Sequence, residues 1–142
     1  MTHKSEVGKF GEDLACEYLV KHCFTIVERN FRKPWGELDV IAMAPDKTLV
    51  IVEVKTMKES LDYAQDKSGN PATCSDRSVG IAGLNPEDNL TAAKLQKLQR
   101  TAILYANDNP QLINDERGWR IDLIAITLIN GKEPLIKHFE NI

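Results

Sequence analysis

The sequence predicts an α/β fold with the element order α-β-β-β-α-β-β. Residues 5–23 and 90–109 repeat apolar side chains at spacings of three and four, which is typical of amphipathic helices. The remaining ordered segments are short, rich in β-branched residues and bounded by turn-forming residues, which is typical of strands. With 142 residues the chain can bury one core, so we expect a single domain over residues 1–142.

The N-terminal half is expected to form one helix and three strands. Ser5 is a candidate cap for the first helix. Pro34 and Gly36 mark a turn after the first strand, and "APDK" separates the second strand from the third, most simply as a β-hairpin. The expected strands of this half are 24–32, 36–44 and 48–56.

The C-terminal half begins with a long segment that lacks any period. Residues 57–90 are either a functional loop or an insertion, because structureless connections of this length are uncommon inside compact domains. Thr91 is a candidate cap for the second helix, and Lys94 lies off its apolar stripe. The expected elements that follow are a helix at 90–109 and strands at 118–129 and 134–142.

Composition and charge narrow the class of protein. The formal net charge of −3 argues against binding nucleic acid by overall attraction, although a local basic patch remains open. The apolar runs are too short for a membrane span and the N-terminus lacks a signal-peptide core, so we expect a cytoplasmic protein without membrane association. Three cysteines without C-x-x-C and three scattered histidines predict no disulfide framework and no histidine-based metal site, and His138 is expected at the surface.

The segment "LVIVEVKT" carries two charges in an otherwise aliphatic strand. Side chains alternate across a strand, so Glu53 and Lys55 share one face, and Glu37 and Asp39 share one face of the preceding strand. If the hairpin is centred near Asp46, opposed residue numbers sum to about 92. Asp39 would then oppose Glu53, and Glu37 would oppose Lys55.

Two opposed carboxylates repel each other, and burial increases the cost. Mg²⁺ would neutralise them, because it takes oxygen ligands from one or two carboxylates together with waters and phosphates. Lys55 would add a positive charge that could orient or activate a water for phosphodiester hydrolysis. The pattern therefore predicts a minimal metal-dependent phosphodiesterase site. The alternative is a Glu37–Lys55 ion pair with Asp39 and Glu53 solvated at a sheet edge.

The motif "GELDVIA" followed by "LVIVEVKT" resembles the D…E-x-K core of the restriction-endonuclease-like, or PD-(D/E)xK, superfamily. More closely, the chain resembles the YraN-like family of small bacterial proteins of unassigned role, which is related to archaeal Holliday-junction resolvases. The segments "GKFGEDLACEYL", "ERNFR", "LTAAKLQKL" and "WRIDLIAI" extend the resemblance over most of the chain. It implies a restriction-endonuclease-like fold, with a mixed central β-sheet flanked by helices.

The resemblance also implies roles for individual residues. Asp39 and Glu53 match the ligands of Mg²⁺ or Mn²⁺, and Lys55 matches the catalytic lysine. Glu12 matches an acid near the metal site in the resolvases, with a solvated helix acid as the alternative. Lys94 matches a lysine that could meet substrate phosphate, with an ordinary exposed lysine as the alternative.

Two further acids need separate interpretations. Glu37 is a candidate for substrate binding, as an ion-pair partner or a neighbour of the metal ligands. Asp122 repeats the local sequence of Asp39, since "DLIA" echoes "DVIA", but it lies far from E-x-K and a structural role is favoured. Leu38 replaces the proline of the superfamily motif, and Met57 replaces an arginine that the YraN-like proteins usually carry.

The function implied by the resemblance is a metal-dependent nuclease, an Mg²⁺-dependent endonuclease acting on branched or structured DNA. A homodimer is expected, because a symmetric junction suits a two-fold protein. One alternative is a non-catalytic module that binds nucleic acid or protein with the same fold. A second is a phosphodiesterase for small molecules, which would share the metal and differ in substrate.

Overall fold

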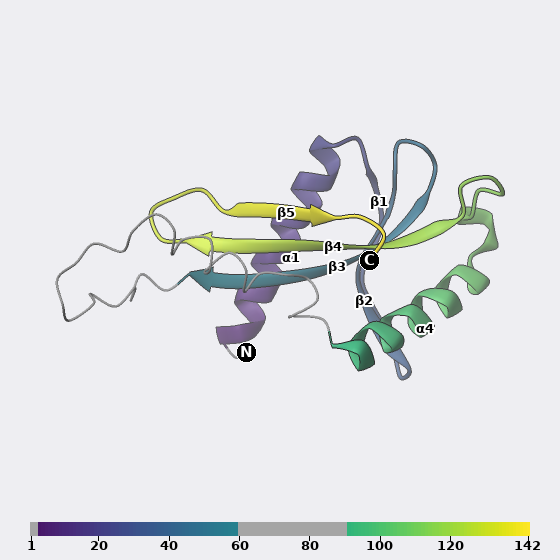
Figure 1. The fold of residues 1–142 in the computed structure, drawn as a ribbon, viewed down its shortest axis with the longest axis horizontal. Coiled ribbons are helices and arrows are strands. Elements are labelled where there is room, and N and C mark those ends of the chain that lie inside the picture. The colour runs from purple at the N-terminus through teal and green to yellow at the C-terminus, as the bar shows by residue number, and fades with distance from the viewer. Residues whose placement is uncertain (1–2, 60–90) are drawn as a thin grey trace.

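The computed structural model describes residues 3–59 and 91–142, which form a mixed α/β arrangement (Figure 1). The predicted order α-β-β-β-α-β-β is confirmed, with one added 3₁₀ turn. None of the helices in these ranges is long and apolar enough to cross a bilayer. The elements are α1 (His3–Lys21), β1 (Thr25–Lys33), β2 (Gly36–Met43), β3 (Leu49–Glu59), α4 (Ala92–Asp108), η1 (Pro110–Leu112), β4 (Trp119–Ile129) and β5 (Leu135–Phe139).

The ends of three elements test the predicted boundaries. Helix α1 begins at His3, so the prediction that Ser5 caps it is wrong. Thr91 does cap α4, because its side chain accepts a hydrogen bond from the Lys94 amide at 3.2 Å. Strand β3 continues to Glu59 because residues 57–59 pair with β4, so the prediction that residues 57–59 belong to a loop is wrong. The rest of that segment, 60–90, lies outside the described residues.

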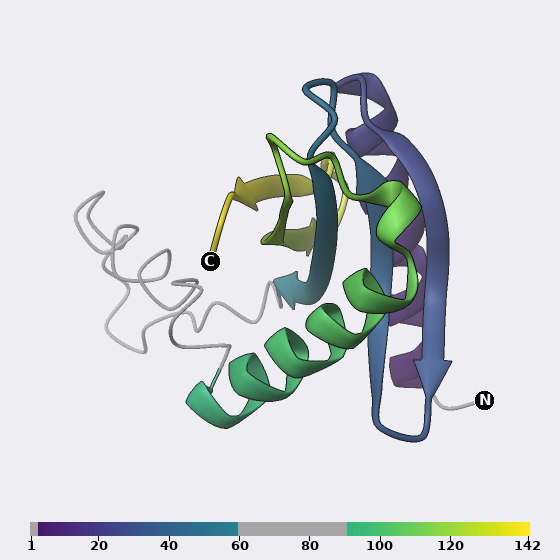
Figure 2. The ribbon, with the colours of Figure 1, turned by 90° about the vertical axis from the view of Figure 1, so that its right-hand side faces the viewer.

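The five strands form one sheet in the order β1-β2-β3-β4-β5. Neighbouring strands are antiparallel except β3 and β4, which are parallel. Parallel neighbours need a crossover connection, and α4 lies within the stretch of chain that joins them. Helix α1 packs on one face of the sheet and α4 on the other, as Figure 2 shows.

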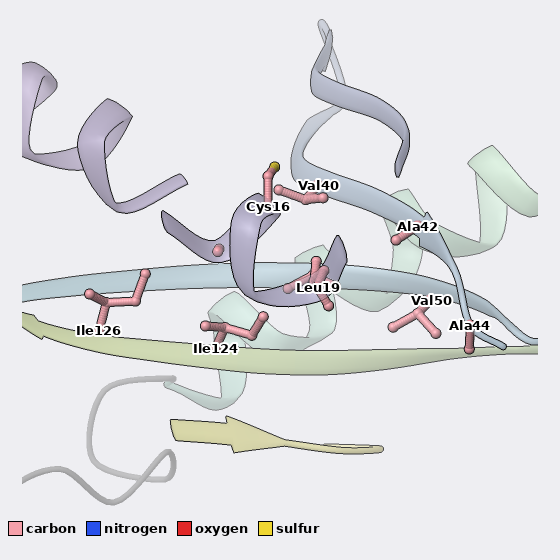
Figure 3. Close-up of a cluster of buried hydrophobic side chains, with 10 residues drawn as sticks. Cys16, Leu19, Val40, Ala42, Ala44, Val50, Ile124 and Ile126 are labelled. Carbon is pink, nitrogen blue, oxygen red and sulfur yellow. The ribbon is translucent and has the colours of Figure 1, made fainter. Parts of the chain in front are cut away.

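The core consists of one apolar layer under each helix. Along β2 and β3 the side chains alternate between the two layers, so both faces of these strands are buried. Near-continuous aliphatic sequence is the expected signature of such strands. The layer under α1 contains Ala15, Cys16, Leu19, Val40, Ala42, Ala44, Val50, Val52, Ile124 and Ile126 (Figure 3). The layer under α4 contains Leu38, Ile41, Leu49, Ile51, Leu98, Ala102, Tyr105 and Ile121.

Strands β2 and β3 form the predicted hairpin and then separate. Their pairs run from Met43↔Leu49 to Val40↔Val52, so opposed residue numbers sum to 92, as the sequence predicts. Beyond Val40 the two strands no longer pair: β2 stays with β1, while β3 stays with β4. Figure 2 shows β3 curving away from β2 with distance from the turn that joins them. We call this place the split; it begins at Asp39 on β2 and at Glu53 on β3.

The alternation of side chains along β2 also breaks at the split. Leu38 packs under α4 and Val40 under α1, although residues two apart on a regular strand face the same way. On the neighbouring β1, Asn30 has a left-handed backbone with φ of 53°. It stands between the pairs Arg29↔Val40 and Phe31↔Leu38, level with Asp39. The irregular backbone of both strands thus coincides with the start of the split.

Two glycines bring the helices close to the sheet beside the split. A Cβ added to Gly11 of α1 would lie 1.8 Å from the Thr56 Oγ1 of β3. A Cβ added to Gly36 of β2 would lie 2.0 Å from the Thr101 Oγ1 of α4. Both distances are far inside van der Waals contact, so only glycine allows these approaches. Because Glu12 follows Gly11, the first approach also fixes how near Glu12 comes to the sheet.

Substitution of Gly11 by Ala is expected to lower the free energy of unfolding by about 1–3 kcal/mol, because the added methyl forces α1 away from β3. Gly8→Ala is the matched control on the same helix, since nothing lies within 4 Å of its added Cβ. Alanine is the better helix former, so Gly8→Ala should raise the free energy of unfolding by up to about 1 kcal/mol. Urea unfolding of both variants measures the difference. Equal effects would show that the contact with Thr56 does not limit helix approach.

Candidate active site

Asp39 is fixed at the split by a hydrogen bond to the neighbouring strand. Its Oδ2 accepts from the Val54 amide of β3 at 2.9 Å. The ladder between β2 and β3 ends at the pair Val40↔Val52. The Val54 amide therefore donates to the side chain of Asp39, where a continuing ladder would offer a backbone carbonyl of β2. The carboxyl group of Asp39 is thereby held against β3, beside Glu53.

Asp39 and Glu53 form a hydrogen-bonded carboxyl pair. Burial raises the pKa of Asp39, although the Val54 amide and Glu53 act in the opposite direction. Burial, the charge of Asp39 and the hydrogen bond to Asp39 together raise the pKa of Glu53 to about 8. The pair therefore holds one proton at neutral pH, with Glu53 donating and Asp39 accepting.

Two lysines adjoin this pair. Lys55 follows Glu53 on the same face of β3, and Lys94 lies in the first turn of α4. Both side chains are exposed, and the charges of both favour the ionised form of Glu53 and so lower its pKa. The structure therefore brings together four of the residues predicted from the sequence, namely Asp39, Glu53, Lys55 and Lys94.

Glu12 approaches Asp39 from the side of α1. Burial, and next the charge of Asp39, raise the pKa of Glu12, while a hydrogen bond from Asn30 and the charges of Arg29 and Arg32 lower it. Lys94 belongs to the helix on the opposite face of the sheet. Because the sheet is open at the split, residues from both helices reach the same carboxyl pair.

The predicted opposition of Glu37 and Lys55 is wrong. The β2–β3 ladder ends at Val40, and Glu37 pairs instead with Arg32 on β1. No salt bridge joins Glu37 to Lys55 in the described ranges 3–59 and 91–142. Glu37 is exposed, and its charge contributes to raising the pKa of Asp39. The alternative interpretation, a Glu37–Lys55 ion pair with Asp39 and Glu53 solvated at a sheet edge, is therefore wrong.

The sequence interpretation missed Arg32 and Asn30, which β1 brings to the site. The positive charge of Arg32 lowers the pKa of both Asp39 and Glu12. Both residues belong to "ERNFR", for which the sequence predicts a strand of the family and no site residue. The β1–β2 pairing could have drawn attention to Arg32, because it stands opposite Glu37. No pattern in the sequence predicts the left-handed backbone of Asn30.

The donor atoms at the split suit a hard divalent cation. Asp39 and Glu53 offer carboxylate oxygens, which Mg²⁺ and Mn²⁺ take as ligands. Across residues 3–59 and 91–142, no three His, Cys, Asp or Glu side chains lie close enough together to hold a metal ion. Two carboxylates completed by waters and substrate phosphates remain an ordinary Mg²⁺ arrangement. Glu12 approaches this pair without joining it as a third ligand.

Asp122, which repeats the local sequence of Asp39, has a different environment. It is fully buried and accepts hydrogen bonds from Arg120 Nε at 3.0 Å and from the Asn141 amide at 3.0 Å. His138 Nε2 lies 2.7 Å from its Oδ2. Burial by itself would raise the pKa of Asp122, but His138, Arg120 and the Asn141 amide outweigh burial and lower it. Asp122 is thus a structural anchor for the C-terminal residues, as favoured from the sequence.

His138 is not the surface residue that the sequence suggested. Its side chain is only 9% exposed and contacts Asp122. Its ring also packs edge-on against Tyr18 of α1, with the centroids 5.6 Å apart. The error arose because β5 is an edge strand, and the sequence does not show that α1 covers part of it.

Substitution of Glu53 by Gln is expected to stabilise the metal-free protein at alkaline pH. A carboxyl with a raised pKa contributes stability that is complete below its ordinary value of 4.5 and is lost as the pH rises through about 8. Glutamine avoids this loss, so the variant's advantage should grow across that window and level off above it at about 2 kcal/mol after solvent screening. Urea unfolding in EDTA at about pH 5 and at about pH 9 measures the difference in stability between the variant and wild type. Exposed Glu133→Gln is the control, and parallel curves for Glu53→Gln and wild type would contradict the prediction.

A mixed sheet opened by a split, with two partly buried carboxyl groups and two adjoining lysines, defines an α/β protein with an acid–acid–lysine site. The family model described as uncharacterised protein family UPF0102 matches residues 11–126. That match contains Glu12, Asp39, Glu53, Lys55 and Lys94. The chain belongs to the UPF0102 family, which confirms the YraN-like part of the predicted resemblance.

Relatives from several bacteria match along nearly their whole length. A UPF0102 protein of Renibacterium salmoninarum is 32% identical over 142 residues, covering 100% of this chain and 99% of the relative. One from Trichlorobacter lovleyi is 34% identical over 135 residues, covering 95% and 87%. One from Paenarthrobacter aurescens is 33% identical over 142 residues, covering 100% and 97%. The family is described as uncharacterised, so membership assigns no activity.

Proposed function

We propose that this chain is a metal-dependent nuclease of the restriction-endonuclease-like superfamily, which hydrolyses phosphodiester bonds of DNA at the split. The observation that carries the proposal is the Asp39–Glu53 carboxyl pair, held by the Val54 amide and adjoined by Lys55 and Lys94. The order of acid, acid and lysine along β2 and β3 matches the D…E-x-K core that the sequence resembles.

The energetics of the pair favour a site that binds a cation. Two partly buried carboxyl groups side by side cannot both ionise freely, which costs folding free energy and would be avoided by an apolar pair. Perturbed pKa values of this kind, with a specific charge partner, cluster at functional sites. A divalent cation would replace the shared proton and allow both groups to ionise. Its chemical contribution would be to polarise a phosphoryl oxygen and lower the pKa of a bound water.

The other residues have roles that follow from their positions. Lys55 projects from the same face of β3 as Glu53 and places its charge where a phosphate would approach the carboxyl pair, so it orients the attacking water and stabilises developing negative charge. Lys94 contacts substrate phosphate from α4. Glu12 assists from α1, close to Asp39 but outside the ligand pair.

We propose DNA, in branched or structured form, as the substrate, and a two-fold homodimer as the active assembly. The net charge of −3 provides no overall attraction to a polyanion, so binding depends on cations gathered at the site. Lys55 and Lys94, together with Arg32 of β1, supply such a local group around the carboxyl pair. The preference for branches comes from the resemblance to junction resolvases.

Calorimetric titration of Mn²⁺ tests the metal site. Wild type should bind with a dissociation constant in the range of micromolar to millimolar, and Asp39→Asn and Glu53→Gln should each bind at least about tenfold more weakly. The exposed acid Asp115 provides the control, so Asp115→Asn should bind as wild type does. Absence of binding to wild type, or equal binding by all four proteins, would refute the metal site.

Cleavage assays with labelled substrates test the reaction class. Four-way junction, duplex and single-stranded DNA, together with a small chromogenic phosphodiester, are incubated with wild type in Mg²⁺ or Mn²⁺. Faster cleavage of the junction supports the nuclease, whereas cleavage of only the small phosphodiester would support the alternative enzyme. Junction binding in EDTA without cleavage in metal would support a non-catalytic binding module.

A further inference from the structure

We infer that Asn30 of β1 is a positioning residue that holds Glu12 of α1 toward the Asp39–Glu53 pair. The inference rests on the proposed function for the meaning of the site, but the contact itself can be tested without metal. Neither the motif in β2 and β3 nor the family description assigns a role to Asn30. Three observations support the role, namely its backbone, its contacts and its place in the sheet.

The backbone of Asn30 is unusual for a strand. Its φ of 53° lies in the left-handed region, which costs roughly 1 kcal/mol for a residue with a side chain and is tolerated best by asparagine and aspartate. A fold that keeps such a conformation inside β1 compensates for it through contacts that an extended backbone would not make. An observed backbone outlier of this kind is grounds for a functional hypothesis.

The side-chain amide of Asn30 acts on the carboxyl group of Glu12 and lowers its pKa. The preceding residue, Arg29, bonds through Nη2 to the Oδ1 of Asp13 at 2.6 Å. Two consecutive residues of β1 therefore act on two consecutive residues of α1, and the first of them is joined to its partner by an ion pair. The pairing fixes the rotation and position of the helix at Glu12, next to the close approach of Gly11.

The place of Asn30 in the sheet connects this contact to the site. Asn30 stands level with Asp39, between the pairs Arg29↔Val40 and Phe31↔Leu38. Glu12 is near enough to Asp39 for their charges to interact. Asn30 and Asp39 thus lie level on neighbouring strands, and Glu12 of α1 interacts with both.

An amide suits this task better than a charged partner would. Its N–H groups donate to Glu12 without adding charge, so Glu12 keeps its negative charge for a cation or a water at the split. An arginine or lysine in the same place would pair with Glu12 and repel a divalent cation. The nearby arginine, Arg29, is itself paired with Asp13.

A double-mutant cycle in EDTA tests the contact. Asn30→Gly keeps the left-handed backbone and removes the amide, and Glu12→Gln removes the charge that the amide holds. If the two substitutions acted independently, their separate effects on the equilibrium constant for unfolding would multiply. We expect the constant of the double variant to differ from that product at least about threefold. Asn141→Gly is the matched control, since Asn141 is also left-handed, with φ of 54°, and should not couple to Glu12→Gln. Additive effects for Asn30 and Glu12 would overturn the inference.

Mn²⁺ calorimetry with the same variants tests the positioning role. Asn30→Gly should weaken Mn²⁺ binding about tenfold in the wild-type background and less than twofold in the Glu12→Gln background. Asn30→Asp keeps the shape of the side chain and the backbone preference but repels Glu12. It should weaken Mn²⁺ binding at least as much as Asn30→Gly does. Unchanged affinity in Asn30→Gly would overturn the inference. If wild type itself binds no Mn²⁺, the proposed function fails, and the cycle in EDTA still decides whether Asn30 holds Glu12.

Discussion

Substitution of Lys55 by Met is expected to slow DNA cleavage by about a hundredfold to a thousandfold while changing Mn²⁺ affinity by less than about threefold. Lys55 is exposed beside Glu53, so its loss removes a positive charge from the place where a phosphate would gain negative charge. The carboxyl pair that would hold the metal remains intact. Single-turnover cleavage of a four-way junction, together with Mn²⁺ calorimetry, measures the two effects separately.

Lys58 provides the control for this prediction, because it is also exposed on β3 but lies farther along the strand from Glu53. Lys58→Met should cleave within about threefold of wild type. Wild-type cleavage by Lys55→Met would remove the lysine from the mechanism. A loss of Mn²⁺ affinity parallel to the loss of cleavage would instead make Lys55 a support for the metal site.

Substitution of Asp122 by Asn is expected to lower the free energy of unfolding by about 3 kcal/mol at pH 7. The substitution removes the buried negative charge that Arg120 and His138 contact. The lowered pKa of Asp122 sets the pH dependence. A carboxyl of this kind contributes stability that is complete above its ordinary value of 3.8 and is lost as the pH falls through its lower folded value. The difference between wild type and variant should therefore be constant at neutral pH and shrink below about pH 4.

Urea unfolding between pH 3 and 8 measures this difference, and Asp115→Asn is the control because Asp115 is exposed. Below its melting temperature, Asp122→Asn should retain Mn²⁺ affinity within about threefold, since Asp122 belongs to the C-terminal anchor and not to the split. A variant with wild-type stability would show that the hydrogen bonds of Asp122 are replaceable. A stable variant that no longer binds Mn²⁺ would move Asp122 into the functional site.

The hairpin shows how far the sequence could specify the candidate site. Its register followed from the alternating pattern and the loop centred on Asp46, and the four observed pairs keep the predicted sum of 92. The same rule failed for Glu37 and Lys55, because it assumes that two paired strands stay paired. The ladder ends at Val40 and Val52, beyond which β2 pairs only with β1 and β3 only with β4. The pairing of β3 with β4 is distant in sequence, so the hairpin alone does not predict where its ladder ends.

The site residues differ in the same way. Asp39, Glu53 and Lys55 could be predicted because they lie close together on two consecutive strands. Asn30 could not, because its importance comes from a backbone angle and from contact with a helix that is distant in sequence. The need for glycine at position 11 could not be predicted either, because it comes from the close approach of Thr56, which is distant in sequence.

The sequence by itself determined the element order and the hairpin register, because periodicity and turn chemistry act over a few residues. It also predicts Asp39, Glu53 and Lys55 as site residues, through the motif that the chain resembles. Only the tertiary structure decided what the two similar segments "DVIA" and "DLIA" do. Asp39 lies where two strands part, next to another acid, and burial raises its pKa. Asp122 lies between β5 and the C-terminal residues, where His138, Arg120 and a backbone amide lower its pKa. Long-range packing places those partners, and the partners determine whether an aspartate of the sheet is available to a cation or serves as a structural anchor.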